Sequence, residues 1–334
     1  MWAEYAPPLV TEVRTTDYHT AGEPFRIVRE GVPPIPGATV RERRAAAAST
    51  DAIDRVRRLL CHEPRGHADM YGCFLVPPDD DGADLAVLFW HKDGYSTACG
   101  HGTIALGAWA VESGRVAAPA DGTVDVTIDV PSGRVVAAVR MRASAVAEVG
   151  FRNVPARVVA RAVPAGDVVA DVAWGGALYA FVPAAALGLR VTPEDLPALI
   201  AAGRRVKAAL DGTEVARHPD DERLSGIYGT VFHEDAGGPL AQRNVAIFAD
   251  GEVDRSPTGS ATSARTALLA ADGVLGEGEA WRNESIVGTS FAARSLGRAP
   301  DGLLTEVVGT AFRTGEHRFL LDPRDPLDTG FVLR

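Results

Sequence analysis

The sequence predicts an α/β (α+β) fold built from two pseudo-symmetric domains, and three observations lead to this prediction. The chain has 334 residues, which favours two domains at a typical size of about 150 residues each. Short strand-like runs bounded by Gly, Pro and Asp outnumber the helical patterns. Two distinctive strings recur in the same order in the two halves of the chain, which is typical of an internal duplication.

The expected elements follow from the spacing of apolar residues. Strands are indicated by alternating or continuous apolar runs, most clearly over 124–130, 133–141 and 156–163. Helices are indicated by apolar residues at helical spacing, over 103–114, 193–211 and 263–275. The run DPRDPLDTG near the C-terminus is loop-like and precedes a short apolar end.

Residues 172–189 carry no charge, so a membrane span has to be weighed for them. Gly175, Gly176 and Pro183 lie inside this segment and interrupt a spanning helix. We therefore expect a buried strand followed by a short Ala-rich helix, and no membrane association.

The duplication rests on two pairs of strings. Gly22 opens GEPFRIV, and Gly176 opens GALYAFV 154 residues later. Cys99 opens a Gly-rich turn before one predicted helix, and Thr258 opens the turn before another, 159 residues later. An Asp-Gly pair precedes each turn. Nearly equal offsets predict that the two halves fold alike.

Charge and cysteine content limit the kinds of binding partner and the cellular location that we expect. The formal net charge of −10 argues against nucleic acid or an anionic membrane as the main partner. The three cysteines include no Cys-x-x-Cys pair and are too few for a disulfide scaffold, so a cytoplasmic location is expected. Residues 1–15 show no basic flank followed by an apolar run, so no signal peptide is expected.

The paired turns are the strongest candidates for a functional site. A Gly-rich turn that opens a helix presents unpaired N–H groups at the positive end of the helix dipole, and two facing turns can hold a carboxylate. Cys99 stands at the first turn beside His101. A thiol at a helix N-terminus is expected to have a lowered pKa and to act as a base. The alternative is a small buried residue, which we expect for Cys61 and Cys73.

Three other features leave alternatives open. The segment Cys61–Asp69 contains side chains that bind zinc, but Pro64 and Gly66 interrupt any helical spacing, so no metal site is expected. His19 is either a substrate contact or a histidine satisfied within a loop. Asp254 either caps the second turn or accepts a hydrogen bond from a substrate ammonium group.

With these residues assembled, the chain resembles the proline racemase family over nearly its whole length. The matching stretches are DYHTAGEPFRIV, CHEPRGHADMYG, HKDGYSTACGHGTIALG and FADGEVDRSPTGSATSARTALL. The resemblance implies two similar domains, each a curved sheet or barrel around a central helix, as in diaminopimelate epimerase. It implies an active site in the cleft between them, no cofactor and no metal. A homodimer is a common assembly in the family.

The resemblance also implies the limits of the domains. The first domain would comprise residues 1–165 with a returning C-terminal strand within 318–334, and it would carry Cys99. The second domain would comprise residues 166–317 and carry Asp254 and Thr258.

Racemases and epimerases of this family place two cysteines on opposite faces of the substrate Cα. One maps onto Cys99 and the other onto Thr258, whose hydroxyl is not ionised near neutral pH. The branch with a Cys-plus-Thr pair dehydrates trans-3-hydroxy-L-proline to Δ1-pyrroline-2-carboxylate. The resemblance therefore implies a lyase in which Cys99 removes the α-proton and the resulting thiol helps to protonate the departing hydroxide. Thr258 would position the substrate.

The substrate contacts implied by the resemblance come from both turns and their surroundings. Residues of the two turns meet the carboxylate or the amine, an aspartate holds the ring nitrogen, and a phenylalanine forms an aromatic wall. By position these are Gly100, His101, Phe248, Asp254, Gly259 and Ser260.

Three other functions stay open from the sequence. The first is a proline or 4-hydroxyproline racemase or 2-epimerase that works without a second thiol. The second is a dehydratase for another β-hydroxy amino acid, and the third is a non-catalytic protein that binds cyclic amino acids. In each case the expected partner is a small molecule.

Overall fold

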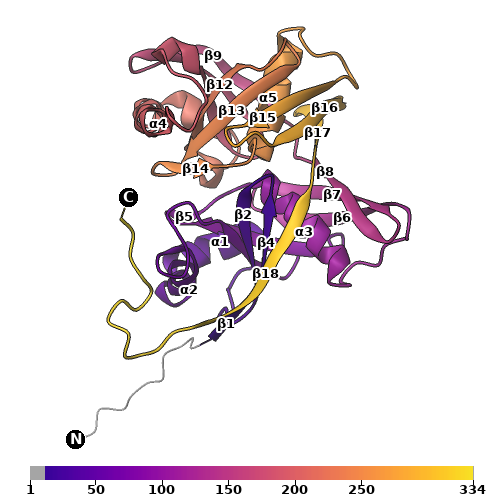
Figure 1. Ribbon diagram of the computed structural model, residues 1–334, viewed down its shortest axis with the longest axis vertical. Helices are drawn as coiled ribbons and strands as arrows, with labels where there is room; N and C mark the ends of the chain where they lie inside the picture. The colour runs from indigo at the N-terminus through magenta and orange to yellow at the C-terminus, as the bar shows by residue number, and fades with distance from the viewer. Residues whose placement is uncertain (1–11, 334) are drawn as a thin grey trace, which may run out of the picture.

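The computed structural model describes residues 12–333 of the chain. The expectation about a signal peptide falls mainly on residues 1–11, outside the described residues. The two halves of the chain form two lobes, with the first half below the second in Figure 1. A long strand near the C-terminus, β18 (Ala311–Leu320), runs from the upper lobe down along the lower one.

The first half is a set of strands in mixed directions. These strands are β1 (Glu12–Thr20), β2 (Glu23–Glu30), β3 (Gly72–Val76), β4 (Leu85–His91), β5 (Gly94–Tyr95), β6 (Gly122–Val130), β7 (Gly133–Arg142) and β8 (Ala145–Arg152). The pairs β1–β2 and β3–β4 are antiparallel, whereas β2–β3 and β4–β6 are parallel. Strands β6, β7 and β8 form an antiparallel meander.

The second half repeats this order of directions. Its strands are β9 (Arg157–Ala165), β10 (Val168–Trp174), β11 (Leu178–Pro183), β12 (Ile227–Asp235), β13 (Ala241–Phe248), β14 (Glu252–Asp254), β15 (Ala280–Ser285), β16 (Ser290–Ala299) and β17 (Gly302–Gly309). The pairs β10–β11 and β12–β13 are antiparallel, β11–β12 and β13–β15 are parallel, and β15 to β17 form a meander. The likeness predicted from two short strings therefore extends through both halves.

One helix lies at the centre of each half. In the first half α3 (Gly100–Glu112) packs against β1, β2, β7, β8 and β18, and in the second half α5 (Gly259–Ala271) packs against β9, β10, β16 and β17. Both helices consist mainly of small or apolar residues and are buried almost throughout. Small residues let the strands come close, since a Cβ on Gly107 would lie 2.6 Å from the Cβ of Ala137.

Further helices cover the outside of each half. They are α1 (Val40–Ser49), α2 (Asp51–Cys61) and α4 (Leu196–Leu210), with short 3-10 helices η1 (Ala184–Leu187), η2 (Glu214–Ala216) and η3 (Glu222–Leu224). The sequence analysis missed α1 and α2. A signal was present, because Thr39 and Glu42 form a reciprocal capping box at the start of α1.

Equivalent strands lie beside the first strand of each half in this pairing, β18 beside β1 and β9 beside β10. Strand β9 follows the first half in the chain but pairs with β10, and β18 follows the second half but pairs with β1. Strand pairing thus groups residues 157–165 with the second half, although the sequence assigned them to the first. The returning strand begins at Ala311, earlier than the expected range 318–334, and beyond Leu320 an isolated bridge joins Phe331 to Glu63. The division into two domains stays a proposal.

The uncharged segment 172–189 contains the end of β10, all of β11 and η1. It is therefore two buried strands and one helical turn, where the sequence predicted one strand and a short helix. Gly175 and Gly176 make the turn between the two strands. Within residues 12–333 no helix is both long enough and apolar enough to cross a membrane.

Candidate active site

The N-termini of the two central helices are in direct contact. A Cβ built on Gly100 would lie 2.5 Å from the Cα of Gly259, and a Cβ on Gly259 would lie 2.8 Å from the Cα of Gly100. No side chain fits at either position, so glycine is required for the close approach of the two backbones. The two Gly-rich turns therefore face one another at the junction of the halves.

A closed cavity lies around this contact. It is lined by residues of both turns and by aromatic side chains, namely Tyr71, Ala98, Cys99, Gly100, His101, Tyr179, Tyr228, Ala246, Phe248, Asp254, Thr258, Gly259 and Ser260. All eight site residues named from the sequence are among them. The remaining space is about 10 Å³, on the order of a single water molecule. A ring-sized ligand therefore does not fit without a rearrangement of the residues around the cavity.

Cys99 is the N-cap of α3, in extended conformation at φ −153°. Its Sγ accepts a hydrogen bond from the N–H of Gly102 at 3.1 Å and lies 3.5 Å from the ring nitrogens of His101. Burial raises the pKa of the Cys99 thiol well above its ordinary value, the Gly102 N–H opposes this, and the charges of Asp254 and Glu23 add to it. The lowered pKa predicted from the sequence is wrong for the closed site, because desolvation outweighs the helix N-terminus.

His101 follows in the first turn of α3 and is buried beside Asp254. Its Nδ1 lies 3.8 Å from Asp254 Oδ2. Burial lowers the pKa of His101, and the charge of Asp254 opposes that shift. The edges of Phe25 and Tyr71 pack against the imidazole at centroid distances of 5.7 and 5.0 Å. The ring is therefore held in a fixed orientation next to the thiol.

Thr258 occupies the equivalent position before α5 but has a different geometry. Its φ of 59° is in the left-handed region, which is costly for a β-branched residue. Its Oγ1 is buried and has no hydrogen-bond partner among the described residues. The Thr258 N–H donates to Ser256 Oγ, and the Ser256 N–H donates to Asp254 Oδ1. Asp254 thus stabilises the turn through Ser256 and does not cap α5 directly.

The wall of the cavity beyond the turns is aromatic. The hydroxyl groups of Tyr179 and Ser260 lie 2.7 Å apart. Phe248 stacks on Tyr228 at 5.5 Å between ring centroids and packs edge-on to Tyr71 at 5.9 Å. The Phe248 ring thus offers a flat apolar surface opposite the polar turns, suited to the face of a small ring.

Hydrogen bonds between the halves hold the cavity closed next to Asp254. Asp69 accepts hydrogen bonds from the Val253 N–H at 3.0 Å and from Arg255 Nη2 at 2.7 Å. Glu23 Oε2 accepts from the Arg255 N–H at 2.7 Å. Burial raises the pKa of Glu23 well above its ordinary value, and the charge of Asp254 adds to the effect.

The structure places the other sequence candidates away from the thiol. Burial raises the pKa of Cys61 to about 12, and Asp69 pairs with Arg255. The segment Cys61–Asp69 is not among the groups of described residues that could hold a metal. His19 lies in β1, where its Nδ1 accepts from the Gly22 N–H at 3.2 Å, so it is a satisfied histidine.

One cluster that could hold a metal ion is present within the described residues, and it was not predicted. The ligand atoms of His91, Asp93 and Glu252 lie within 4.8 Å of one another. Protein groups already occupy them, because His91 Nδ1 lies 2.9 Å from Glu252 Oε1 and Lys92 Nζ lies 2.6 Å from Asp93 Oδ1. The cluster connects the two halves by hydrogen bonds and ion pairs.

Sequence reasoning missed the three tyrosines of the cavity. Tyr71 lies within CHEPRGHADMYG, one of the stretches that match the family, so a signal for it was available. Tyr179 occupies the place of Phe25 in the paired strings that open at Gly22 and Gly176. No pattern in the sequence singled out Tyr228, which reaches the cavity only through the packing of β12.

Comparison with known proteins gives a consistent result. Residues 15–332 match the family model described as proline racemase. A trans-3-hydroxy-L-proline dehydratase of Bacillus cereus is 42% identical over 97% of this chain and 99% of its own. A 3-hydroxyproline 2-epimerase of Burkholderia multivorans is 43% identical over 96% and 98%.

A solved structure supports the fold. The hydroxyproline epimerase from Agrobacterium vitis, with bound trans-4-hydroxy-L-proline, superposes with a TM-score of 0.87 at 29% identity, covering 97% of this chain and 96% of that one. This likeness, together with the repeated strand order, confirms the predicted fold class.

Proposed function

The chain belongs to the proline racemase family, and from this premise we propose that it is a lyase that dehydrates trans-3-hydroxy-L-proline to Δ1-pyrroline-2-carboxylate. One observation carries the proposal. Among the described residues that line the cavity, Cys99 is the one thiol, and the facing turn offers the hydroxyl of Thr258. Chemistry at one face of Cα fits this arrangement, and two-base inversion does not. The name of the Bacillus cereus relative supports the same reaction.

Cys99 is the base in the proposed reaction. Its thiolate removes the α-proton, and the Gly102 N–H at 3.1 Å stabilises the negative sulfur. His101, neutral because burial lowers its pKa, lies against the same sulfur and fixes its direction. The high pKa of the thiol also makes the thiolate a strong base once it is formed.

The helix N-termini and the aspartate hold the substrate. The N–H groups of Gly100, Gly259 and Ser260 meet the carboxylate, where charge develops as the α-proton leaves. In a closed, water-poor site each aimed donor is typically worth about 2.7–4 kcal/mol in the transition state. Asp254 takes the ring ammonium, and Phe248 covers the face of the ring.

Thr258 positions the substrate and exchanges no protons. In trans-3-hydroxy-L-proline the α-hydrogen and the 3-hydroxyl lie on the same face of the ring. One thiolate on that face is sufficient for elimination, which yields an enamine that tautomerises to the cyclic imine. The unpartnered Thr258 Oγ1 is available to the substrate from the opposite side. Water elimination requires no electron carrier, in keeping with an enzyme that needs no cofactor.

An epimerase is the second candidate, because the Burkholderia multivorans relative carries that name. Proton NMR in D₂O separates the two. We expect conversion of trans-3-hydroxy-L-proline alone, with loss of its C3 carbinol signal and appearance of the imine. Samples with trans-4-hydroxy-L-proline and L-proline should stay unchanged. Deuterium at Cα together with an epimer of any substrate would establish an isomerase. No reaction with any of them would refute the proposed substrate and leave a dehydratase for another β-hydroxy amino acid or a binding protein.

A cytoplasmic location and a homodimer also belong to the proposal. All three cysteines are free and buried, as expected for a protein in a reducing compartment. The small-molecule partner is a hydroxyproline-type amino acid. Size-exclusion chromatography with light scattering measures the mass, and about twice 35.1 kDa is expected.

A further inference from the structure

The three tyrosine hydroxyls of the cavity have different partners. The Tyr179 hydroxyl is hydrogen-bonded to Ser260 at 2.7 Å and so belongs to the second turn. The Tyr71 hydroxyl is hydrogen-bonded to Ser96 Oγ and lies 3.1 Å from the Tyr228 hydroxyl. Tyr71, Tyr228 and Ser96 thus form a chain of three hydroxyls, in which either oxygen of each pair can donate.

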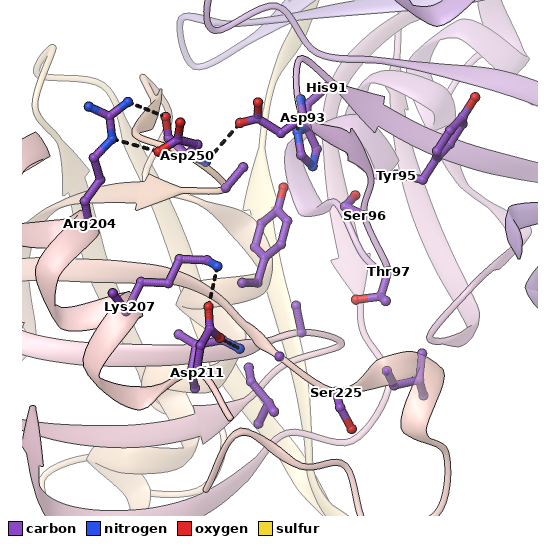
Figure 2. Close-up of a pocket in the computed structure, with 18 of the residues that line it drawn as sticks. His91, Asp93, Tyr95, Ser96, Thr97, Arg204, Lys207, Asp211, Ser225 and Asp250 are labelled. Carbon is purple, nitrogen blue, oxygen red and sulfur yellow. Dashed lines mark hydrogen bonds and ion pairs between the residues drawn. The ribbon is translucent and has the colours of Figure 1, made fainter. Parts of the chain in front are cut away.

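This hydroxyl chain connects two cavities. Tyr71 and Tyr228 line the closed site around Cys99. Tyr228 and Ser96 also line an outer cavity of about 540 Å³ between the halves, and Figure 2 shows Ser96 in its wall.

Charged side chains form part of the wall of the outer cavity. Figure 2 also shows two ion pairs there, Arg204 with Asp250 and Lys207 with Asp211. A cavity of this size with charged side chains in its wall holds water. The chain therefore leads from an almost dry site to a hydrated one.

Tyr71, the middle member of the chain, lies beside the proposed base. The Tyr71 ring packs edge-on to His101 at 5.0 Å between centroids, and the His101 nitrogens lie 3.5 Å from Cys99 Sγ. Burial raises the pKa of Tyr71 well above its ordinary value, and a charge on Cys99 adds to this effect. Burial also raises the pKa of Tyr228. Both phenols therefore keep their protons while the thiolate acts, and they are donors.

Hydroxide is a poor leaving group unless it receives a proton as the C–O bond breaks. The thiol formed at Cys99 carries the α-proton and is directed at Cα. With a second proton donor on the same face of the ring, the Cys99 thiol does not have to protonate the departing hydroxyl as well as act at Cα. Tyr71 contacts His101, which in turn contacts the thiol, and this places its ring beside the base.

We propose that Tyr71 protonates the departing 3-hydroxyl and that Tyr228 and Ser96 hold it and return a proton to it from the outer cavity. The inference rests on the proposed dehydration. The Cα–H electrons become the new double bond, the C–O electrons leave with oxygen, and the Tyr71 proton completes the water molecule. Tyr71 regains a proton from solvent water through the chain, and the Cys99 thiol gives the α-proton to solvent water as the product leaves, so both groups are restored before the next turnover.

The test uses two leaving groups on one ring. Fluoride leaves trans-3-fluoro-L-proline without being protonated, whereas trans-3-hydroxy-L-proline requires a donor. For Tyr71→Phe we expect kcat on the hydroxy substrate to fall by about a hundredfold, and kcat on the fluoro substrate by less than about threefold. Tyr228→Phe should show the same selectivity with a loss of about tenfold, because Tyr71 remains.

Two comparisons complete the experiment. Tyr95→Phe removes a buried tyrosine hydroxyl that is directed away from the outer cavity (Figure 2) and is not part of the chain, so it should leave both rates unchanged. Thermal unfolding checks that each variant is folded.

If Tyr71→Phe lowers kcat equally on both substrates, Tyr71 has only a packing role. If it lowers neither rate, Tyr71 takes no part in the reaction. Both results would overturn the proposal while the wild-type protein still dehydrates its substrate. A wild-type protein that eliminates nothing would overturn the proposed function as well.

Discussion

The two helix N-termini occupy equivalent places in two halves with the same strand order, yet their first residues differ. Cys99 has an ordinary extended backbone, and its Sγ caps α3 by accepting from the Gly102 N–H. Thr258 has φ 59°, makes no side-chain cap on α5, and leaves Oγ1 without a partner among residues 12–333. One N-cap side chain is held in place, and the other is free to meet a ligand.

This difference shows how a duplicated fold supports one-sided chemistry. Two equivalent thiols would act from both faces of Cα. In the proposed reaction the first half provides the base, and the second half provides a strained turn with a hydroxyl that does not titrate near neutral pH. The close contact of Gly100 with Gly259 and the proposed carboxylate site are common to both halves.

Replacement of the base should have the largest effect. We expect Cys99→Ser to lower kcat by about a thousandfold, because a serine hydroxyl is a far weaker base than a thiolate. Imine formation followed by NMR measures the loss. Cys61→Ala, which removes a buried thiol that does not line the cavity, is the matched control and should retain turnover. Full activity of Cys99→Ser would refute the assignment of the base.

A methyl group at the contact of the turns should have the next largest effect. A Cβ on Gly100 meets the backbone of Gly259 at 2.5 Å, so Gly100→Ala must push the two turns apart. Misplacement by about 1 Å costs on the order of a hundredfold in rate, and we expect that loss in kcat/KM. Gly276→Ala is a suitable control, since Gly276 has no positive φ and a Cβ there comes no closer than 3.4 Å to another residue. Wild-type kinetics for Gly100→Ala would show that the contact is not needed.

The pH profile tests the electrostatics of the first turn. Burial raises the pKa of Cys99, so the thiolate is scarce at neutral pH and becomes more abundant as the pH rises. We expect kcat/KM to climb by about tenfold per pH unit above pH 7, with no plateau below about pH 9. Thermal unfolding at each pH excludes loss of fold. A plateau already at pH 7 would instead support the lowered pKa that the sequence predicted.

A second thiol should make the two turns alike. Thr258→Cys places an ionisable group on the opposite face, so we expect new exchange of the α-proton of L-proline in D₂O with formation of D-proline. Water elimination should fall by about tenfold or less, since Thr258 positions the substrate. Chiral chromatography and NMR measure both. If neither exchange nor inversion occurs, features beyond this residue separate the two chemistries.

The smallest expected effect concerns backbone strain. Glycine adopts positive φ without cost, so Thr258→Gly relieves backbone strain. Cys99 has an extended backbone, so Cys99→Gly relieves no such strain, and it loses the hydrogen bond from the Gly102 N–H. We expect Thr258→Gly to be less destabilising than Cys99→Gly by about 1–2 kcal/mol in the free energy of unfolding. Urea unfolding of both variants gives the difference. An equal loss would mean that Thr258 stores no strain.

The sequence was most informative where chemistry resides in short motifs. Cys99 and Thr258 were identified by the turns that they open, and the eight residues named from the motifs line one cavity. The duplication was visible in GEPFRIV and GALYAFV. The helices α1 and α2 were missed. The apolar pattern of α1 is weak although a capping box marks its start, whereas α2 has Ile53, Val56, Leu59 and Leu60 at helical spacing, a signal that was present and overlooked.

The sequence by itself determined which residue types open the two central helices, because those are local strings with a fixed chemical meaning. The tertiary structure decided how these residues behave. Burial raises the pKa of Cys99 because the strands and the other half exclude water from the thiol, and no local pattern reports that desolvation. Tyr71 meets Tyr228 only because two halves that are far apart in the chain close on one another.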